Sequence, residues 1–362
     1  MTHGMTLGLD TLRRLPKTDL HLHLDGSLRP RTVWELAREQ GVKVPARTAG
    51  QLAKKLRAGE RTRSLADYLK IFDITLSVLQ EKEALRRVAY ELAEDCAREN
   101  VRHAEVRYSP ILHQKGGLDL PSILEPVIQG LKDAERDFGL STGVILCGMR
   151  NISPKRSVEL AELAVAYRKK GVIGFDLAGE EKEFPAKHHR EAFAIVLSHN
   201  INSTVHAGEG FGPPSIAQAL HYCGAHRIGH GTRLHEDADL LQYVLDHRIP
   251  LEVCLTSNVQ TRTVPTLLKH PFKKYLDAGV RVTLNTDNTM VSNTTISKEY
   301  ARAVRAFGLS PYQVKRIVVS GFKSAFLPYA QKARLLRQVI VEIDNVFMEA
   351  FPDSYDRAAS VL

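Results

Sequence analysis

The 362-residue sequence has four cysteines, one tryptophan and no long apolar run. Its cysteines are far apart and form no CxxC pair, so they indicate neither a disulfide framework nor a cysteine zinc site. Two of them, Cys147 and Cys254, stand in apolar stretches and are expected to be small core residues. Chemistry that depends on paired cysteines is therefore not expected.

Segments that would direct the chain to a membrane are also missing. No stretch approaches the length of a membrane-spanning helix, and residues 1–15, MTHGMTLGLDTLRRL, lack the apolar centre of a signal peptide. There is no low-complexity segment or obvious linker, and 43% hydrophobic and 25% charged residues are ordinary for a globular protein. We expect one domain over residues 1–362, located in the cytoplasm and without membrane contact.

The formal charge of +9 makes an anionic partner such as nucleic acid worth weighing. However, most basic residues are scattered along the chain. The densest group, AKKLRAGERTR at 53–63, has no interleaved aromatic residues and is better explained as a solvated helix and turn. We expect no nucleic-acid partner and no obligate protein partner.

Short β-like runs recur along the whole chain and alternate with amphipathic helical segments. The runs cover 18–24, 102–108, 142–149, 171–178, 202–208, 226–231, 250–257 and 281–287. Eight strands separated by helices predict a parallel sheet closed into a (β/α)₈ barrel, the TIM barrel. The stretch 25–101 is too long for one barrel helix and predicts extra helices there, and residues 288–362 are expected to be mostly helical.

Residues suited to metal binding and acid–base chemistry stand at the ends of these predicted strands, where a barrel places its active site. They are His21, His23, Asp25, His206, Glu209, His230 and Asp287. Three imidazoles and a carboxylate suit Zn²⁺ and leave room for a bound water. The two-residue spacing of His21 and His23 places both rings on one face of a strand.

A histidine at a strand end is often structural instead. With 15 histidines in the chain, several must be ordinary, and His188 and His189 in PAKHHR are expected to be such cases. The metal-site interpretation is favoured because HxH, HAGE, HGT and TD all fall at strand ends of one proposed barrel.

These motifs carry a family resemblance. The segments PKTDLHLHLDGSLRP, AEVRYSP, FDLAGEE, VHAGEG, RIGHGTRL, EVCLTSN and LNTDN occur in order from about residue 16 to about 328. Through them the chain resembles the adenosine deaminase family of metal-dependent amidohydrolases. HxH alone is shared by many amidohydrolases, whereas HLDG, HAGE, HGT and SN together are far more specific.

The resemblance implies one catalytic zinc ion per subunit, held by His21, His23, His206 and Asp287. The ion lowers the pKa of its bound water towards neutrality. His230 is implied to lie beside that water and to orient it, accept its proton or stabilise its charge. As an alternative, His230 is a packed histidine after a glycine turn.

Three further residues are implied to touch a purine nucleoside. Glu209 is expected to protonate purine N1, which requires a carboxyl group that keeps its proton near neutral pH. The backbone of Gly179 is expected to approach N3, although this glycine could equally serve a simple turn. Asp25 matches the position that contacts the ribose 5′-hydroxyl, where a carboxylate accepts a hydroxyl and repels a phosphate.

One position departs from the family pattern. The family commonly has Asp-Asp after the last strand, and this chain has Asp287 followed by Asn288. The second residue is expected to meet purine N7, and an amide supplies the required donor at any pH. Purine deamination therefore stays plausible, while the choice of substrate is open.

The resulting expectation is zinc-dependent hydrolysis of adenosine, and of 2′-deoxyadenosine, to inosine or deoxyinosine and ammonia in purine salvage. The alternative substrates are aminodeoxyfutalosine, adenine or an adenine nucleotide. A further alternative of another class is a catalytically silent barrel that acts as a binding module. The PCxxC signature of zinc deaminases that act on nucleic acid is missing from the sequence.

Overall fold

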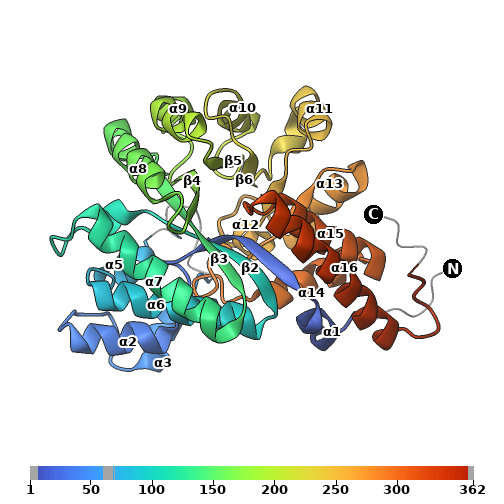
Figure 1. Cartoon of the computed structure of the whole chain (residues 1–362), viewed down its shortest axis with the longest axis horizontal. Helices are drawn as coiled ribbons and strands as arrows, with labels where there is room; N and C mark the ends of the chain where they lie inside the picture. Colours follow the sequence, from blue (N-terminus) through green and yellow to red (C-terminus); the bar gives the residue numbers. More distant parts are fainter. Residues whose placement is uncertain (1–6, 60–67, 69, 358–362) are drawn as a thin grey trace.

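The computed structural model describes residues 7–59, 68 and 70–357. Eight parallel strands form one sheet in the order β1 to β8, with helices between them (Figure 1). The strands are β1 (Lys17–His23), β2 (Val101–Tyr108), β3 (Ser141–Met149), β4 (Val172–Ala178), β5 (Asn202–Ala207), β6 (Arg227–His230), β7 (Leu251–Val253) and β8 (Val282–Leu284). The predicted (β/α)₈ barrel is confirmed.

The barrel closes between its last and first strands through main-chain contacts of Asp287. Leu22 and Asp287 form a parallel β-bridge beyond the end of β8. The backbone N–H of His23 donates to the Asp287 carbonyl at 2.8 Å, and the N–H of Asp287 donates to the His21 carbonyl at 2.8 Å. Three predicted metal ligands are therefore joined by the backbone where the barrel closes.

Helices surround the sheet, as Figure 1 shows. They are α1 (Leu9–Arg14), α2 (Pro30–Glu39), α3 (Ala49–Lys55), α5 (Phe72–Ser77), α6 (Lys82–Arg98), α7 (Leu120–Phe138), α8 (Pro154–Tyr167), α9 (Arg190–Ser198), α10 (Pro213–His221), α11 (Ala238–Asp246), α12 (Leu255–Gln260), α13 (Phe272–Ala278), α14 (Ile296–Phe307), α15 (Pro311–Ser324) and α16 (Tyr329–Ala350). Short 3₁₀ turns are η1 (Pro110–His113), η2 (Ala186–His189), η3 (Leu234–Glu236) and η4 (Leu267–Lys269). The extra helices expected between the first two strands and after the eighth are present.

Local sequence explains where several helices begin. Two prolines open α10, where their missing N–H groups cost no hydrogen bond. Ser310 and Gln313 form a reciprocal capping box at the start of α15. In the basic stretch 53–63, α3 ends at Lys55, and residues 60–63 lie outside the described part of the chain.

The last two strands are shorter than the sequence pattern predicts. The run 250–257 was expected to be strand throughout, but β7 ends at Val253 and Leu255 begins α12. The N–H of Asn258 donates to the Cys254 carbonyl at 2.9 Å, which is a helical bond. A short apolar run fits a buried strand and a buried helical turn equally well, so periodicity could not separate them.

The expected strand at 281–287 ends at Leu284 because Asn285 changes the bonding pattern. The Asn285 side chain accepts from the N–H of Leu20 at 2.9 Å and donates to Thr283 Oγ1 at 3.0 Å. Further along, Asp287 adopts a left-handed backbone with φ of 61°. The side chain of Asn285 thus bonds to the backbone of β1 at this point, and backbone bonds to β1 resume at Asp287.

Cys147 and Cys254 are buried as expected, and both are free thiols. Among the described residues, no helix combines the length and apolarity needed to cross a bilayer.

Candidate active site

Four side chains from three parts of the barrel converge at the carboxyl ends of the strands. His21 and His23 lie on β1, His206 on β5, and Asp287 follows β8. Their candidate ligand atoms all lie within 4.8 Å of one another. Nε2 of His23 is 3.1 Å from Nε2 of His206, and Asp287 Oδ1 is 3.5 Å from Nε2 of both His21 and His23. The structure thus brings together the four residues predicted to hold a metal.

The outer nitrogens of two of these imidazoles are held by buried carboxylates. His21 Nδ1 lies 2.9 Å from Glu252 Oε2, and His206 Nδ1 lies 3.0 Å from Asp176 Oδ2. A carboxylate acceptor places the ring proton on Nδ1, so Nε2 keeps its lone pair facing the other ligands. This is the tautomer that metal binding requires.

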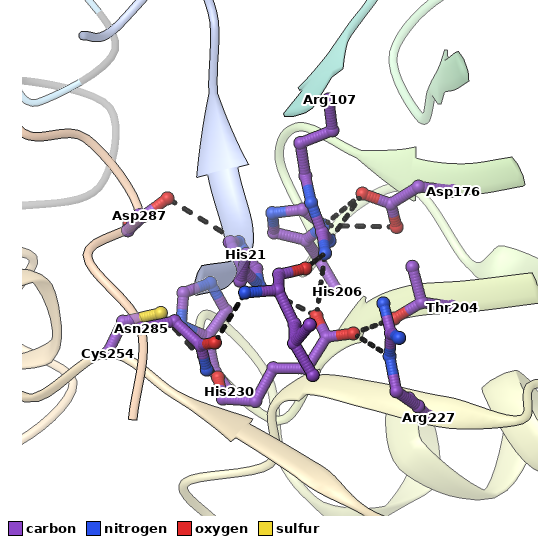
Figure 2. Close-up of polar contacts among 12 residues, drawn as sticks. His21, Arg107, Asp176, Thr204, His206, Arg227, His230, Cys254, Asn285 and Asp287 are labelled. Carbon is purple, nitrogen blue, oxygen red and sulfur yellow. Dashed lines mark hydrogen bonds and ion pairs between the residues drawn. The ribbon is translucent and has the colours of Figure 1, made fainter. Parts of the chain in front are cut away.

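An ion network inside the barrel keeps those carboxylates charged and in place (Figure 2). The fully buried Arg107 donates to Asp176 Oδ2 and to Glu252 Oε2, both at 3.0 Å. Arg227 donates to Glu252 Oε1 at 2.6 Å, and Thr204 donates to the same oxygen at 2.9 Å. Although burial alone would raise it, this pairing holds the pKa of Glu252 well below its usual range. The network therefore fixes the orientation of His21 and His206 through the ring nitrogens that face away from the ligand cluster.

The donor set fits a zinc ion. Nε2 of His21 is buried and has no hydrogen-bond partner, so the protein leaves this atom unsatisfied. Donor atoms about 2.0–2.1 Å from one tetrahedral ion lie roughly 3.4 Å apart, close to the 3.1 and 3.5 Å separations seen here. Burial would raise the pKa of Asp287, but its close contact with His21 and the charges of the nearby histidines hold that pKa below its ordinary value, so the carboxylate is available as a ligand.

Glu209 lies beside this cluster and is buried. Its Oε2 is 3.4 Å from His230 Nε2, and its Oε1 accepts a hydrogen bond from Thr261 at 3.0 Å. Burial, with the nearby charges of Asp287 and Glu181, raises the pKa of Glu209 to about 8. This carboxyl group therefore keeps its proton at neutral pH, as a general acid must.

The loop that carries Glu209 is held by a second buried carboxylate. Glu181 Oε1 accepts from the N–H of Gly208 at 2.6 Å. Its Oε2 accepts from the N–H of Glu209 at 3.0 Å and from that of Gly210 at 2.6 Å. Three consecutive backbone donors thus converge on one side chain, which fixes the backbone from which Glu209 extends.

His230 ends β6 in a left-handed backbone conformation with φ of 63°. Its ring lies 4.7 Å from that of His21, centroid to centroid, and its Nδ1 is 3.1 Å from Asn258 Nδ2. Positive φ in a residue other than glycine is uncommon and concentrates at functional sites. Both His230 and Asp287 adopt this unfavourable backbone conformation here.

A cavity of about 300 Å³ opens in front of these groups. Its walls include apolar side chains from several elements, namely Tyr68, Phe72, Leu76, Leu112 and Met149. Asp25, Asp73 and Glu180 add carboxyl groups, and no lysine or arginine of the described chain lines the cavity. A flat, largely apolar and uncharged ligand suits such walls.

The residues predicted to touch substrate also line this cavity. Asp25 Oδ1 is buried without a partner, and burial raises the pKa of Asp25 to about 7. Gly179 has φ of 98°, so a side chain would be strained there. A Cβ on Gly26 would lie 1.7 Å from Oδ1 of Asn288, so only glycine leaves room for that amide.

Two histidines expected to be structural lie outside the ligand cluster. His189 is buried, with Nδ1 2.8 Å from Ser157 Oγ and Nε2 3.3 Å from the Arg150 carbonyl oxygen. His188 is exposed.

The residues that orient the site residues through hydrogen bonds and ion pairs were not identified from the sequence. These are Arg107, Asp176, Glu181, Arg227, Glu252, Asn258, Thr261 and His270. Several stand inside the quoted motifs, such as Asp176 and Glu181 in FDLAGEE and Asn258 in EVCLTSN. Charged residues inside strands that must be buried were an available signal, because a buried charge needs a partner. Which partner it takes depends on barrel geometry, which the sequence does not display.

Known proteins resemble this chain over most of its length. The family model described as adenosine deaminase matches residues 16–342. An adenosine deaminase from Mycolicibacterium gilvum is 41% identical over 92% of this chain and 96% of its own length. A probable adenosine deaminase from Dictyostelium discoideum is also 41% identical over 94% of this chain, which spans only 44% of that longer protein.

Solved structures agree with this relationship. The adenine deaminase from Arthrobacter aurescens superimposes with a TM-score of 0.84 at 28% identity, covering 90% of this chain and 98% of its own. The N6-methyl-AMP deaminase from Arabidopsis thaliana does so with a TM-score of 0.81 at 29% identity, covering 93% and 98%. The chain therefore belongs to the adenosine deaminase family, hydrolases of the metal-dependent amidohydrolase type that act on C–N bonds.

Proposed function

We propose that this protein is a zinc-dependent deaminase that converts adenosine, and 2′-deoxyadenosine, to inosine or deoxyinosine and ammonia in purine salvage. The observation that carries this proposal is Glu209. It is a buried, proton-retaining acid within 3.4 Å of His230 and beside the four-ligand cluster. An acid facing the purine and a metal facing the attacking water are the two parts that hydrolysis at C6 needs.

His21, His23, His206 and Asp287 would hold one zinc ion per subunit. When bound, the ion lowers the pKa of a water so that it can attack at neutral pH. Glu252 and Asp176 keep the histidines in the required tautomer through the 2.9 and 3.0 Å contacts described above. His230 orients the attacking water next to its own Nε2.

Glu209 supplies the proton that the purine ring needs. As the water oxygen adds to C6, N1 becomes basic, and the carboxyl proton of Glu209 moves to it. The C6–N6 bond then breaks, and the amino group takes one proton of the attacking water and leaves as ammonia. The other water proton restores the carboxyl group of Glu209, and the C6 oxygen and the N1 proton remain in the inosine product. One water is consumed and one ammonia is released for each nucleoside.

The other contacts orient the nucleoside in the cavity. Gly179 allows the backbone to approach N3, and Asn288 offers its NH₂ group to N7. Asp25 meets the ribose 5′-hydroxyl with its unsatisfied Oδ1. Its pKa of about 7 means that near neutral pH it alternates between an acceptor and a donor form, and a hydroxyl can pair with either.

The charges around the cavity favour a nucleoside over a nucleotide. The described lining includes Asp25, Asp73 and Glu180 and contains no lysine or arginine to pair with a phosphate. Adenine remains an alternative substrate because it keeps every contact except that of Asp25. Aminodeoxyfutalosine also remains one because it retains both adenine and ribose. All four cysteines are free thiols, which supports a reducing cytoplasmic location.

A deamination assay on protein of measured zinc content tests the proposal. The wild type should bleach adenosine absorbance and release ammonia in equal amounts. The variant Glu209→Gln should bind zinc as well as the wild type and lose about 10²-fold or more in kcat, because the amide has no proton to give. Undiminished turnover by that variant would contradict the role of Glu209, and a wild type that releases no ammonia from any purine would contradict the function.

A further inference from the structure

A chain of three buried side chains leads from outside the site to His230. His270 follows η4, Asn258 lies on α12, and His230 ends β6. All three are buried, with exposed fractions of 4%, 0% and 1%. Neither His270 nor Asn258 touches the four-ligand cluster in the contacts described above. Each of the two links in this chain can be assigned a donor and an acceptor.

The assignment begins at His270, whose proton position is fixed by the backbone. The N–H of Phe272, the first residue of α13, donates to His270 Nδ1 at 3.0 Å, so Nδ1 must be unprotonated. Burial lowers the pKa of His270 to about 3, and its ring is therefore neutral at physiological pH. A neutral ring with a bare Nδ1 carries its proton on Nε2.

The amide of Asn258 is oriented by that proton. His270 Nε2 lies 3.2 Å from Asn258 Oδ1, and as a donor it requires the oxygen, and not the NH₂ group, to face it. The Nδ2 group must then point the other way, towards His230 Nδ1 at 3.1 Å. Amide orientation is normally ambiguous, but here the bond from Phe272 removes the ambiguity.

We infer that Asn258 and His270 are positioning residues that hold His230 in the neutral tautomer with its proton on Nε2. Asn258 Nδ2 donates to His230 Nδ1, so that nitrogen is an acceptor. The imidazolium form would place a second N–H against the amide NH₂ and lose this bond. Its Nε2–H then points into the site, on the side of Glu209 Oε2.

This tautomer decides between the roles left open for His230. A protonated Nε2 can donate a hydrogen bond to the attacking oxygen and stabilise its developing charge, but it has no lone pair with which to take a proton. His230 therefore acts as a donor and not as a general base. The catalytic consequence rests on the proposed function, whereas the tautomer itself does not.

The direct test is ¹⁵N NMR of histidine-labelled, zinc-loaded protein, with the His230 signals identified as those lost in His230→Gln. Wild-type His230 should show a protonated Nε2 and a bare Nδ1 between pH 6 and pH 9. Finding the proton on Nδ1 would overturn the inference. This spectrum needs no substitution at Asn258 or His270 and no enzymatic activity.

The variant Asn258→Asp supplies the matched kinetic test, because it keeps the side-chain shape and the bond from His270. It replaces the donor facing His230 with an acceptor, so His230 should gain a proton on Nδ1. We expect kcat to fall about tenfold or more, with KM changed less than about threefold and zinc content unchanged. An unaltered His230 spectrum together with unaltered kcat would overturn the inference.

A pair of variants at His270 keeps the test decisive if Asn258→Asp does not fold. His270→Gln retains a donor towards Asn258 and should preserve most of kcat, whereas His270→Phe retains the ring shape without the donor and should lower it. Equal kcat values for these two variants would overturn the inference that His270 positions His230 through Asn258. If the protein deaminates no purine but shows the Nε2–H signal of His230, the proposed function is contradicted and the inference about the tautomer is supported.

Discussion

Glu181 holds the backbone N–H of Glu209, at 3.0 Å, together with the N–H groups on either side of it. The same carboxylate brings a negative charge close to the Glu209 side chain and contributes to the high pKa of that group. One buried residue thus fixes both the position and the protonation of the proposed acid.

Replacing Glu181 with glutamine should therefore change two properties. Glutamine has one acceptor oxygen, so at least one backbone donor loses its partner, and the free energy of unfolding should fall by about 1–3 kcal/mol. Removing the charge makes ionisation of Glu209 easier, which lowers its pKa. Denaturant unfolding and a pH–rate profile measure both effects. Glu183→Gln, an exposed position in the same loop, is the control and should change neither.

The pH dependence of activity should show the titration of Glu209. Only its protonated form can serve as the acid, and its pKa is about 8. We expect kcat/KM for adenosine to fall about tenfold per pH unit above that value, because kcat/KM reports the free enzyme. In Glu181→Gln this decline should begin at lower pH. A decline that begins at the same pH in both proteins would mean that the Glu181 charge does not influence Glu209.

The network behind the metal ligands should be costly to break. Glu252→Gln leaves Arg107 and Arg227 without a full counter-charge in the barrel interior. Breaking such a pair costs about 3–5 kcal/mol, and loss of a carboxylate behind a ligand weakens metal binding about 10–100-fold. Thr204→Val removes one hydrogen bond to the same carboxylate and should cost only about 1 kcal/mol.

Thermal unfolding with and without a chelator measures the loss of stability, and zinc titration measures the loss of zinc affinity. Because zinc binds the folded chain, the chelator should lower the Tm of the wild type. It should lower the Tm of Glu252→Gln less, since that variant binds zinc more weakly. Equal zinc affinity in the two proteins would show that Glu252 does not support His21.

Asp25 should determine the preference for a ribose. Asp25→Ala loses the hydrogen bond to the 5′-hydroxyl, so kcat/KM for adenosine should fall about 10–100-fold. Adenine has no ribose, so its turnover should change little, and the adenosine-to-adenine ratio measures the effect. Asp25→Asn keeps one acceptor oxygen, so its adenosine-to-adenine ratio should lie between those of the wild type and Asp25→Ala. An unchanged ratio in Asp25→Ala would place the ribose elsewhere.

The barrel was predictable from sequence because its signals are local. Eight short apolar runs with helices between them indicate the architecture, and HxH on β1 places two rings on one face. Strands β7 and β8 were predicted but end earlier than expected, because Leu255 begins a helix and the side chain of Asn285 bonds to the backbone of Leu20. The Asn285 difference depends on a contact with Leu20, far away in the chain, whereas the pattern around Leu255 fits a strand and a helical turn equally well.

The candidate site shows the same division. His21, His206 and Asp287 could be named from motifs, and the structure brings them together, while their roles stay predictions. Residues such as Arg107 and His270 could not be named, because their importance depends on partners more than ten residues away. Sequence motifs show the residues that face the substrate, and the geometry shows what orients them.

The most direct measurement compares kcat/KM for adenosine, adenine, AMP and aminodeoxyfutalosine on one preparation of measured zinc content. The acid-lined cavity without lysine or arginine in its described lining predicts adenosine as the best substrate, with AMP far below it. Better turnover of AMP than of adenosine, or release of ammonia from none of the four, would contradict the account.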